Sequence, residues 1–379
     1  MLVYIMTFCS SLLLFLLFAG GSRTKIINGE YTTFKRLVIS KFDLAVFMSA
    51  LPPMIISAIR YYVGTDYLET YYTGFYRILE GSDIDGFELG FWVLNKAIQL
   101  VTDNVFWLFI ITSILFVGFV YKAIGVISVD VPLSIILFLV TRYYFIGMNG
   151  IRQFIGLAFL TYSLKYVFDN NLKKFLLFIV IACMFHHTCI LFSPIYFLSK
   201  FRLNIRKVIV VVLVEIALFT IALPIILYAL EGTKYGALTS KFDLPGVKFT
   251  IFTIVLNTIL FIVGYIGKKN KDDIRINASF NIQFLALLSA LALQTIPLIE
   301  RVYWIFSFPI IVTFPYLIKG IKSKDIRIAI KWGVVIIFTI YMLYDICILG
   351  DHEVLPYQTI IGETPSHYCG WEWYGGFFK

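Results

Sequence analysis

Apolar runs long enough to cross a lipid bilayer recur along nearly the whole of this chain. A transmembrane helix needs about 20 mostly apolar residues, and the backbone polar groups inside the bilayer must be hydrogen-bonded within the protein. Only 15% of the residues are charged, against about 25% in soluble domains, so there is too little charge to cover a soluble surface. The sequence therefore predicts an all-α polytopic membrane protein, with residues 1–379 forming a single membrane domain.

The lengths of these runs predict about twelve transmembrane helices. The segment 2–20 has no basic residue ahead of its apolar stretch, which argues against a cleaved signal peptide. Two segments, 174–186 and 188–199, are short for a bilayer, so we expect them to be tilted or broken around His186 and His187. The expected spans are 2–20, 42–59, 104–120, 127–146, 150–167, 174–186, 188–199, 208–230, 249–267, 280–298, 302–318 and 332–349.

The distribution of lysine and arginine predicts the orientation of the chain. If the N-terminus lies outside, 22 of the 32 basic residues fall in inner loops, as the positive-inside rule requires. We therefore predict that both termini lie on the outer face, and we attribute the net charge of +9 to this rule rather than to a nucleic-acid partner. The outer face then receives the loops 60–103 and 231–248 and the C-terminal tail 350–379.

Four arginines stand out among the basic residues that remain outside. Arg60, Arg142, Arg152 and Arg301 lie at the expected outer ends of spans, where a charge is costly unless it is paired or bound to an anion. The planar guanidinium binds phosphate through two parallel hydrogen bonds, whereas lysine acts as a point charge. Several arginines at this border therefore favour a lipid-linked diphosphate as ligand. The alternative is that each arginine pairs with a nearby acid or a phospholipid headgroup.

The start of the fifth expected span is the strongest local candidate for an anion site. It reads Asn149-Gly150-Ile151-Arg152-Gln153. Backbone N–H groups and the helix dipole favour an anion at a helix N-terminus, and the polar side chains of this segment add further donors. We therefore predict that it contributes to binding a phosphate group.

Histidine is a candidate for proton transfer because its imidazole titrates near neutrality. His186 and His187 lie together at the outer end of an expected hydrophobic hairpin. An acid/base or substrate-contact role and a structural hydrogen-bonding role both remain open. Adjacent histidines point in different directions on a helix, and no nearby cysteine or acidic cluster completes a ligand set, so we predict no metal site and no cofactor.

Short motifs, taken in order, resemble those of the EpsG family of polytopic membrane proteins. That family is similar to the Wzy-type O-antigen and exopolysaccharide polymerases and belongs with the metal-independent membrane glycosyltransferases of the GT-C class. The family more often has serine where this chain has Thr188, a departure that keeps the hydroxyl. The motifs are Arg60-x-x-Val63-Gly64-x-Asp66-Tyr67, Glu88-x-Gly90, Asn149-x-x-Arg152-Gln153, Phe185-His186-x-Thr188 and, late in the chain, Arg301-x-Tyr303.

The resemblance implies a GT-C-like architecture and a polysaccharide polymerase of the bacterial inner membrane, with its active site on the periplasmic or extracellular side. The donor and the acceptor would both be undecaprenyl-diphosphate-linked oligosaccharides, and the further partners would be membrane lipids and a chain-length regulator. The product would be O-antigen, capsule or exopolysaccharide. The residues expected to take the acceptor proton are Asp66, Glu88 or His186. Those expected to hold the leaving diphosphate are Arg60, Arg152 and Arg301, with Asn149 and Gln153 beside Arg152.

Two alternative functions remain open. A flippase or transporter of lipid-linked sugars also needs outer arginines, but it should show polar groups on both sides of the midplane and usually internal symmetry. A membrane acyltransferase that modifies glycans takes its acyl donor from the cytoplasm and should carry notable residues on the inner face. The notable polar residues here crowd the expected outer side, which favours the polymerase.

Overall fold

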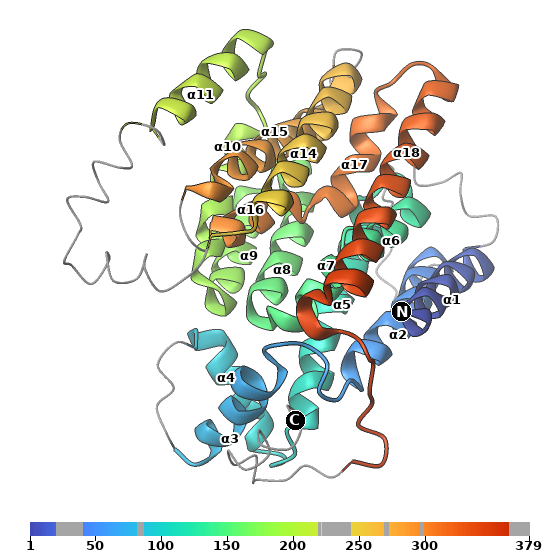
Figure 1. Ribbon diagram of the computed structural model, residues 1–379, viewed down its shortest axis with the longest axis vertical. Helices are drawn as coiled ribbons and strands as arrows, with labels where there is room; N and C mark the ends of the chain where they lie inside the picture. The colour runs from blue at the N-terminus through green and yellow to red at the C-terminus, as the bar shows by residue number, and fades with distance from the viewer. Residues whose placement is uncertain are drawn as a thin grey trace. The chain divides into compact units, whose positions relative to one another are not determined.

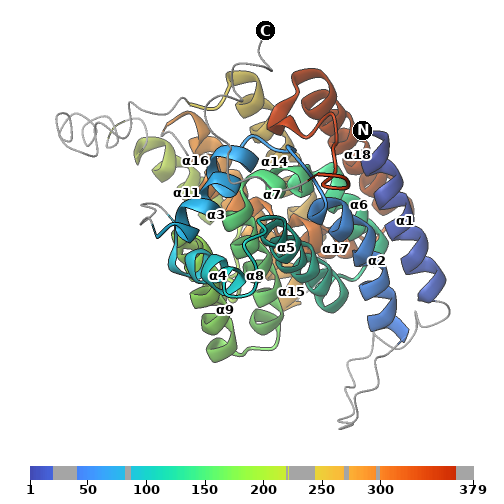
Figure 2. The same cartoon turned by 90° about the horizontal axis from the view of Figure 1, so that it is seen from below.

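The computed structural model describes residues 1–19, 41–81, 87–218, 221, 244–268, 273–295 and 299–363 (Figures 1 and 2). Regular structure in these ranges is helical, apart from one isolated antiparallel bridge between Arg60 and Thr359. The chain divides into two compact units, and each is described by itself. Unit 1 contains residues 1–162, 180–187 and 335–379, and unit 2 contains residues 163–179 and 188–334.

Unit 1 begins with apolar helices that pack in succession. Helix α1 (Leu2–Phe18) lies against α2 (Lys41–Ala58), and α2 lies against α5 (Phe106–Ile127) (Figure 2). Ser11 on α1 donates a buried 2.6 Å hydrogen bond to the Ser49 carbonyl on α2. Small hydroxyl residues at such crossings let apolar helices approach closely and satisfy their own polar groups.

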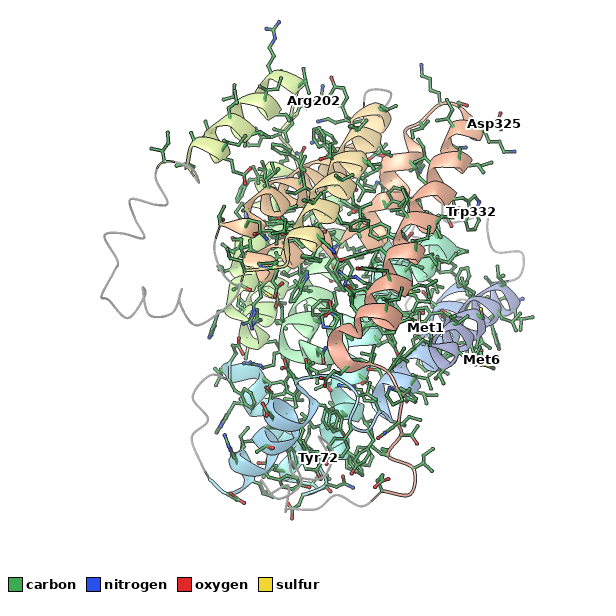
Figure 3. All side chains as sticks on the ribbon, in the orientation of Figure 1. Met1, Met6, Tyr72, Arg202, Asp325 and Trp332 are labelled. Carbon is green, nitrogen blue, oxygen red and sulfur yellow. The ribbon has the colours of Figure 1, made fainter. Side chains whose placement is uncertain are left out.

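The segment between α2 and α5 lies within the expected outer loop 60–103 and is compact. It contains a π-helical turn (Tyr67–Tyr72), α3 (Thr73–Leu79) and α4 (Leu89–Gln99). Its aromatic side chains are largely buried, among them Tyr72, which Figure 3 labels. Packed aromatic residues thus give this loop a core of its own.

The expected span 127–146 is divided in two. Helices α6 (Val131–Val140) and α7 (Tyr143–Asn149) meet at a bend of 54°. At the bend Arg142 has a φ of +69°, a left-handed conformation that interrupts a right-handed helix. The expected start at residue 127 was also wrong, because α5 continues to Ile127 and Asp130 caps α6 by accepting a hydrogen bond from a backbone N–H.

Three helices contribute residues to both units. They are α8 (Ile151–Phe168), α9 (Leu172–Phe185) and α18 (Lys324–Leu343). Helix α18 continues into a π-helical turn (Tyr344–Leu349) and then a single 3-10 turn (Asp351–Glu353). These last two elements belong to unit 1.

Unit 2 is built around α14 (Val247–Lys268) and α15 (Ile274–Leu291), which pack against each other. A buried polar network crosses them: Asn257 Nδ2 donates to the Tyr303 hydroxyl and Gln283 Nε2 donates to Asn257 Oδ1, each at 3.0 Å. In Figure 3, Arg202 and Asp325, which lies in the first turn of α18, are at the same end of this unit. The other described elements are a 3-10 turn that begins at the end of unit 1 (His187–Phe192), α10 (Ile195–Leu198), α11 (Ile205–Ala217), a 3-10 turn after α15 (Ala292–Gln294), α16 (Ile299–Ser307) and α17 (Ile310–Lys319).

Five described helices are long and apolar enough to cross a membrane, or up to seven if each of two bent pairs counts as one span. The second pair, α16 and α17, bends by 49° at Pro309, which lacks the N–H that would continue the helix. The chain is therefore a multi-pass membrane protein, but about twelve spans and a GT-C-like architecture are not confirmed.

Part of the shortfall in span number arises from short helices, while α8, with 18 residues, is long enough but is not among the candidate spans. Helix α1 has 17 residues and α9 has 14, and the expected span 188–199 is a 3-10 turn followed by the four-residue α10. Each is shorter than a typical bilayer crossing. Most of the expected span 208–230 beyond residue 218, most of the expected outer loop 231–248 and the tail beyond residue 363 lie outside the described residues.

Candidate active site

The carboxylate of Glu88 lies between two basic side chains. Its Oε1 is 2.8 Å from His186 Nδ1, and its Oε2 is 2.6 Å from Arg152 Nη1. Glu88 immediately precedes α4, Arg152 lies in the first turn of α8, and His186 immediately follows α9. Three separate segments of unit 1 therefore converge, and each contributes a residue from one of the motifs identified in the sequence.

Glu88 is ionised at neutral pH. Its side chain is 6% exposed, and burial by itself would raise the pKa of its carboxyl. The hydrogen bond from His186 and the charge of Arg152 outweigh burial and lower that pKa to about 2. An ionised carboxylate can only accept hydrogen bonds, so the Nδ1–H group of His186 donates the hydrogen bond and Glu88 accepts it.

This hydrogen bond prepares the second ring nitrogen of His186 to act as a base. In a neutral imidazole with its proton on Nδ1, the lone pair lies on Nε2. His186 Nε2 is buried and has no hydrogen-bond partner among the described residues, while the whole side chain is 12% exposed. A carboxylate that orients a histidine in this way is a common arrangement for general-base catalysis.

The packing of α4 against α9 explains why a glycine follows Glu88 at position 90. A β-carbon on Gly90 would lie 2.7 Å from the carbonyl oxygen and 2.8 Å from the Cβ of Met184. Real atoms do not approach so closely, so only glycine allows the two helix backbones to meet here. Because Met184 is two residues before His186, this contact helps to set the separation between His186 and Glu88.

Two aromatic side chains complete the surroundings of Arg152, and the sequence analysis singled out neither. The guanidinium carbon of Arg152 lies 4.8 Å from the centroid of the Phe87 ring, a cation–π distance. The phenol of Tyr71 is buried nearby, and the charge of Arg152 opposes the rise that burial causes in its pKa. Phe87 could have been suspected as the neighbour of Glu88, but no local signal distinguishes Tyr71 from the other tyrosines around it.

Asp66, the third residue expected to take the acceptor proton, lies beside this group. It is half-buried, precedes the π-helical turn Tyr67–Tyr72 and acts on the Tyr71 phenol through its charge. Of the three candidates, Glu88 and His186 are the two joined by a direct hydrogen bond.

Arg60 joins two helix ends. Its side chain is 1% exposed, and its guanidinium donates to the Ser57 carbonyl at the end of α2 and, at 3.2 Å, to the Met148 carbonyl at the end of α7. Its guanidinium carbon also lies 5.0 Å from the centroid of the Phe109 ring. Carbonyls at a helix C-terminus carry partial negative charge, so both helix ends stabilise this cation. That Arg60 holds a diphosphate stays a prediction.

The remaining expected ligands of the diphosphate are dispersed. Asn149 and Gln153 are both buried. Asn149 Nδ2 donates to the His352 carbonyl at 3.1 Å, and its Oδ1 lies so close to Gly64 that a β-carbon there would be 2.4 Å away. Arg301 is exposed on α16 in unit 2. Its expected role stays a prediction that the geometry of unit 1 does not address.

The chain after α18 pairs with the loop after α2. The backbone N–H groups of Tyr61 and Gly64 donate to the carbonyls of Gln358, at 3.0 Å, and Glu353, at 3.1 Å. Residues 350–363, the described part of the expected outer tail, therefore line the loop that carries the first motif.

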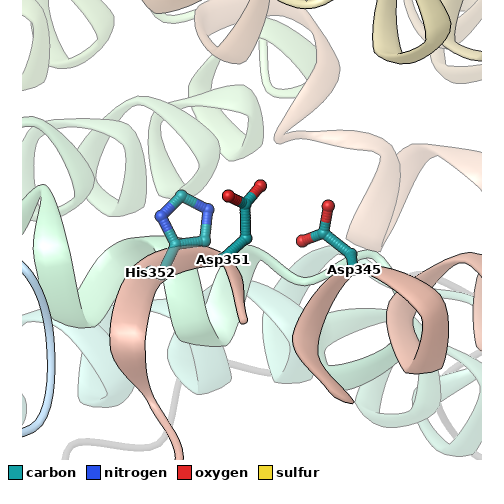
Figure 4. A group of neighbouring side chains, drawn as sticks. All are labelled: Asp345, Asp351 and His352. Atoms are coloured by element: carbon teal, nitrogen blue, oxygen red, sulfur yellow. The ribbon is translucent and has the colours of Figure 1, made fainter. Parts of the chain in front are cut away.

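A second polar cluster lies at the end of α18, formed by Asp345, Asp351 and His352 (Figure 4). One ligand-type atom from each lies within 4.8 Å of the others. Arg142 forms an ion pair with Asp345, and burial followed by the charge of Arg142 lowers the pKa of His352 to about 4. A cation would have to compete with this guanidinium, so we interpret the cluster as part of the ion pair that ties the α6–α7 bend to α18.

Comparison with known proteins agrees with the motifs. A family model described as the EpsG family matches residues 43–359, a range that includes every residue of the Glu88 group. Comparisons with curated proteins and with solved structures found no match. Since the family model covers most of the sequence, the chain belongs to the EpsG family, a family of Wzy-like polymerases.

Proposed function

We propose that this chain polymerises a polysaccharide at the outer face of the bacterial cytoplasmic membrane, by joining repeat units carried on undecaprenyl diphosphate. Membership of the EpsG family supports the polymerase reaction in general terms. The observation that carries the more specific proposal is the bridging of Arg152 and His186 by Glu88. This group offers, in one place, a cation for a leaving diphosphate and a base for an acceptor hydroxyl.

The proposed step transfers the growing glycan from its lipid carrier to a second repeat unit. The bond between the anomeric carbon of the donor glycan and the diphosphate oxygen breaks, and its electron pair leaves with the diphosphate. The acceptor hydroxyl oxygen forms the new bond to that carbon and loses its proton to His186 Nε2. Glu88 contacts none of the reacting atoms; it orients the imidazole and stabilises the imidazolium that forms. We therefore assign His186 as the base and Glu88 as a positioning residue.

Arg152 is assigned to the leaving group. It lies in the first turn of α8, where the helix dipole already favours an anion. Its guanidinium has five N–H donors in a fixed plane, so it can bond Glu88 and a phosphate oxygen together. Positive charge that is fixed before the reaction stabilises the negative charge that develops on the diphosphate.

The first test replaces His186 by asparagine and follows the length distribution of surface glycan on a gel. Asparagine can keep a donor to Glu88, but it has no equivalent of Nε2. We expect the ladder of long chains to disappear while single repeat units remain, because units would be made and exported but not joined. His187→Asn is the matched control, since this exposed neighbour lies outside the proposed group and the ladder should persist.

A full ladder in the His186→Asn strain, with the variant at parental abundance in the membrane, would refute the assignment of the base. A strain lacking the gene separates the alternative functions. Retention of the single unit supports a polymerase, loss of even the single unit indicates a flippase, and an unchanged ladder directs attention to acyl transfer.

A further inference from the structure

Helix α4 carries apolar side chains on an exposed face as well as on its buried face. Phe91 and Ile98 are buried on one side of the helix. The opposite side exposes large apolar side chains at helical spacing, and two more follow the last residue of the helix. These five residues, the apolar patch, are Leu89 (62% exposed), Trp92 (37%), Val93 (46%), Leu100 (88%) and Val101 (86%).

Lys96, the charged residue of α4, is bonded into the rest of the loop. Its ammonium donates a 2.7 Å hydrogen bond to the Ile78 carbonyl in α3 and lies 5.9 Å from the centroid of the Trp92 ring. A lysine at the border of a lipid phase keeps its ammonium among polar groups while its carbon chain covers apolar surface. The patch is therefore apolar along its length, with its one charge held by a backbone carbonyl.

Two neighbouring helices of unit 1 indicate that the patch faces lipid. Helix α4 lies against α5, which is one of the described helices that are long and apolar enough to cross a membrane. At the start of α4, Gly90 contacts the backbone of Met184 on α9. Met184 and Val180 on α9 are themselves apolar and exposed, by 38% and 59%. The patch thus continues an apolar surface that belongs to the helices of a multi-pass membrane protein.

The length of α4 sets how it can lie in a membrane. The helix has 11 residues, about half of the roughly 20 that a transmembrane helix needs. A short helix with an exposed apolar face lies along the membrane surface, with that face at the boundary between headgroups and acyl chains. Tryptophan is enriched at this depth. Trp92 in the patch and Trp107, which is 48% exposed in the first turn of α5, agree with such a position.

We propose that α4 is an interfacial helix whose apolar patch binds the acyl chains of the lipid leaflet at this end of α5. Glu88 immediately precedes α4, so this anchoring holds Glu88, together with Arg152 and His186, near the depth of the lipid phosphates. A diphosphate attached to a lipid lies at the same depth. That consequence for the reaction rests on the proposed function, whereas the membrane contact does not.

The test measures how strongly brominated lipids quench the fluorescence of Trp92. The full-length protein is reconstituted into phosphatidylcholine vesicles that carry bromine near the glycerol end of the acyl chains, near their methyl end, or not at all. The signal of Trp92 is the difference between the parent and Trp92→Phe, which keeps an aromatic ring in the patch. We expect bromine to quench this signal, and more strongly from the glycerol end than from the methyl end.

Trp332 supplies the positive control for contact with lipid. It is 47% exposed on α18, a candidate membrane span, so bromine at one position or the other should quench the signal lost in Trp332→Phe. Iodide, which stays in water, should quench the Trp92 signal less than it quenches free tryptophan.

A second pair of variants links the membrane contact to the reaction. Val93→Asp places a carboxylate in the patch, and a charge is costly in an apolar environment. We expect it to weaken the quenching of Trp92 by bromine and to shorten the surface-glycan ladder. Arg77→Asp is the matched control, because it introduces the same side chain at an exposed position of α3 outside the patch. Both of its readouts should stay parental.

No quenching of Trp92 by bromine, in vesicles where Trp332 is quenched, would overturn the inference, because the patch would then face water or another protein. If bromine quenches Trp92 but the His186→Asn strain keeps its ladder, the membrane contact stands and the polymerase mechanism fails. If bromine quenches Trp92 in the parent and Val93→Asp keeps both its membrane abundance and a parental ladder, the contact stands and its role in placing Glu88 fails.

Discussion

Replacing Glu88 by glutamine removes a charge interaction whose size follows from the structure, while the shape of the side chain is retained. The pKa of this carboxyl falls from 4.5 to about 2, and one pKa unit corresponds to about 1.4 kcal/mol. The ionised carboxylate therefore contributes on the order of 3 kcal/mol to the stability of the folded state. A neutral glutamine loses this contribution and removes the acid that pairs with Arg152.

The sign of the pH dependence follows from the direction of the shift. Because the folded-state pKa of Glu88 lies below 4.5, the carboxylate stabilises the folded protein fully at pH values above about 4.5. This contribution is lost as the pH falls from there towards 2. The parent should therefore be more stable than Glu88→Gln at neutral pH, and the difference should shrink in acid.

The assay is unfolding of the purified protein in detergent at several pH values, combined with the glycan ladder in cells. Glu80→Gln is the control, because Glu80 is exposed at the end of α3 in the same outer segment. Glu88→Gln should lose both stability and the ladder, and Glu80→Gln should lose neither. Parental stability of Glu88→Gln at neutral pH would refute the energetic reasoning, and a parental ladder would refute the positioning role.

Two further substitutions test the geometry around Glu88. Arg152→Lys should reach parental abundance in the membrane but lose most of the glycan ladder, because a point charge cannot bond a carboxylate and a phosphate together through a planar fork. Arg77→Lys, on the exposed face of α3, is the control and should keep the ladder. Full activity of Arg152→Lys would refute bidentate phosphate binding. Gly90→Ala should reduce glycan chain length by separating α4 from α9, whereas Gly333→Ala, where a β-carbon meets nothing within 4 Å, should be neutral in the same gel assay.

The sequence predicted an all-α membrane protein correctly because apolar composition is a local property, but the expected number of about twelve spans is not confirmed. It also singled out Glu88, Arg152 and His186 separately, from charge position, titration range and a family resemblance. Their convergence could not be read from the sequence, since it depends on how closely α4 packs on α9 and where α8 begins. Gly90 was visible in its motif, but its reason, contact with the backbone of Met184, appears only in three dimensions.

Two features, the position of Tyr71 and the helix break at Arg142, were missed because the sequence around each residue looks ordinary. Tyr71 is one of 24 tyrosines, and the pattern around it is the ordinary aromatic enrichment of a membrane interface. The break at Arg142 was hidden by continuous apolar sequence on both sides. A non-glycine residue in the left-handed conformation carries no reliable sequence mark, so the expected span 127–146 could not be divided in advance.

Arg60 and Arg152 show why position in the sequence was insufficient to rank the predicted diphosphate ligands. Both were expected at the outer end of a span, but Arg60 is 1% exposed and bonded to carbonyls of two helix ends, whereas the side chain of Arg152 is 21% exposed and paired with a carboxylate. A phosphate could replace those carbonyls only by opening the ends of α2 and α7. A phosphate at Arg152 instead adds to, or exchanges with, one side-chain ion pair, which costs the fold far less. The physical cost of making room for a ligand therefore favours Arg152 as the diphosphate-binding arginine of unit 1.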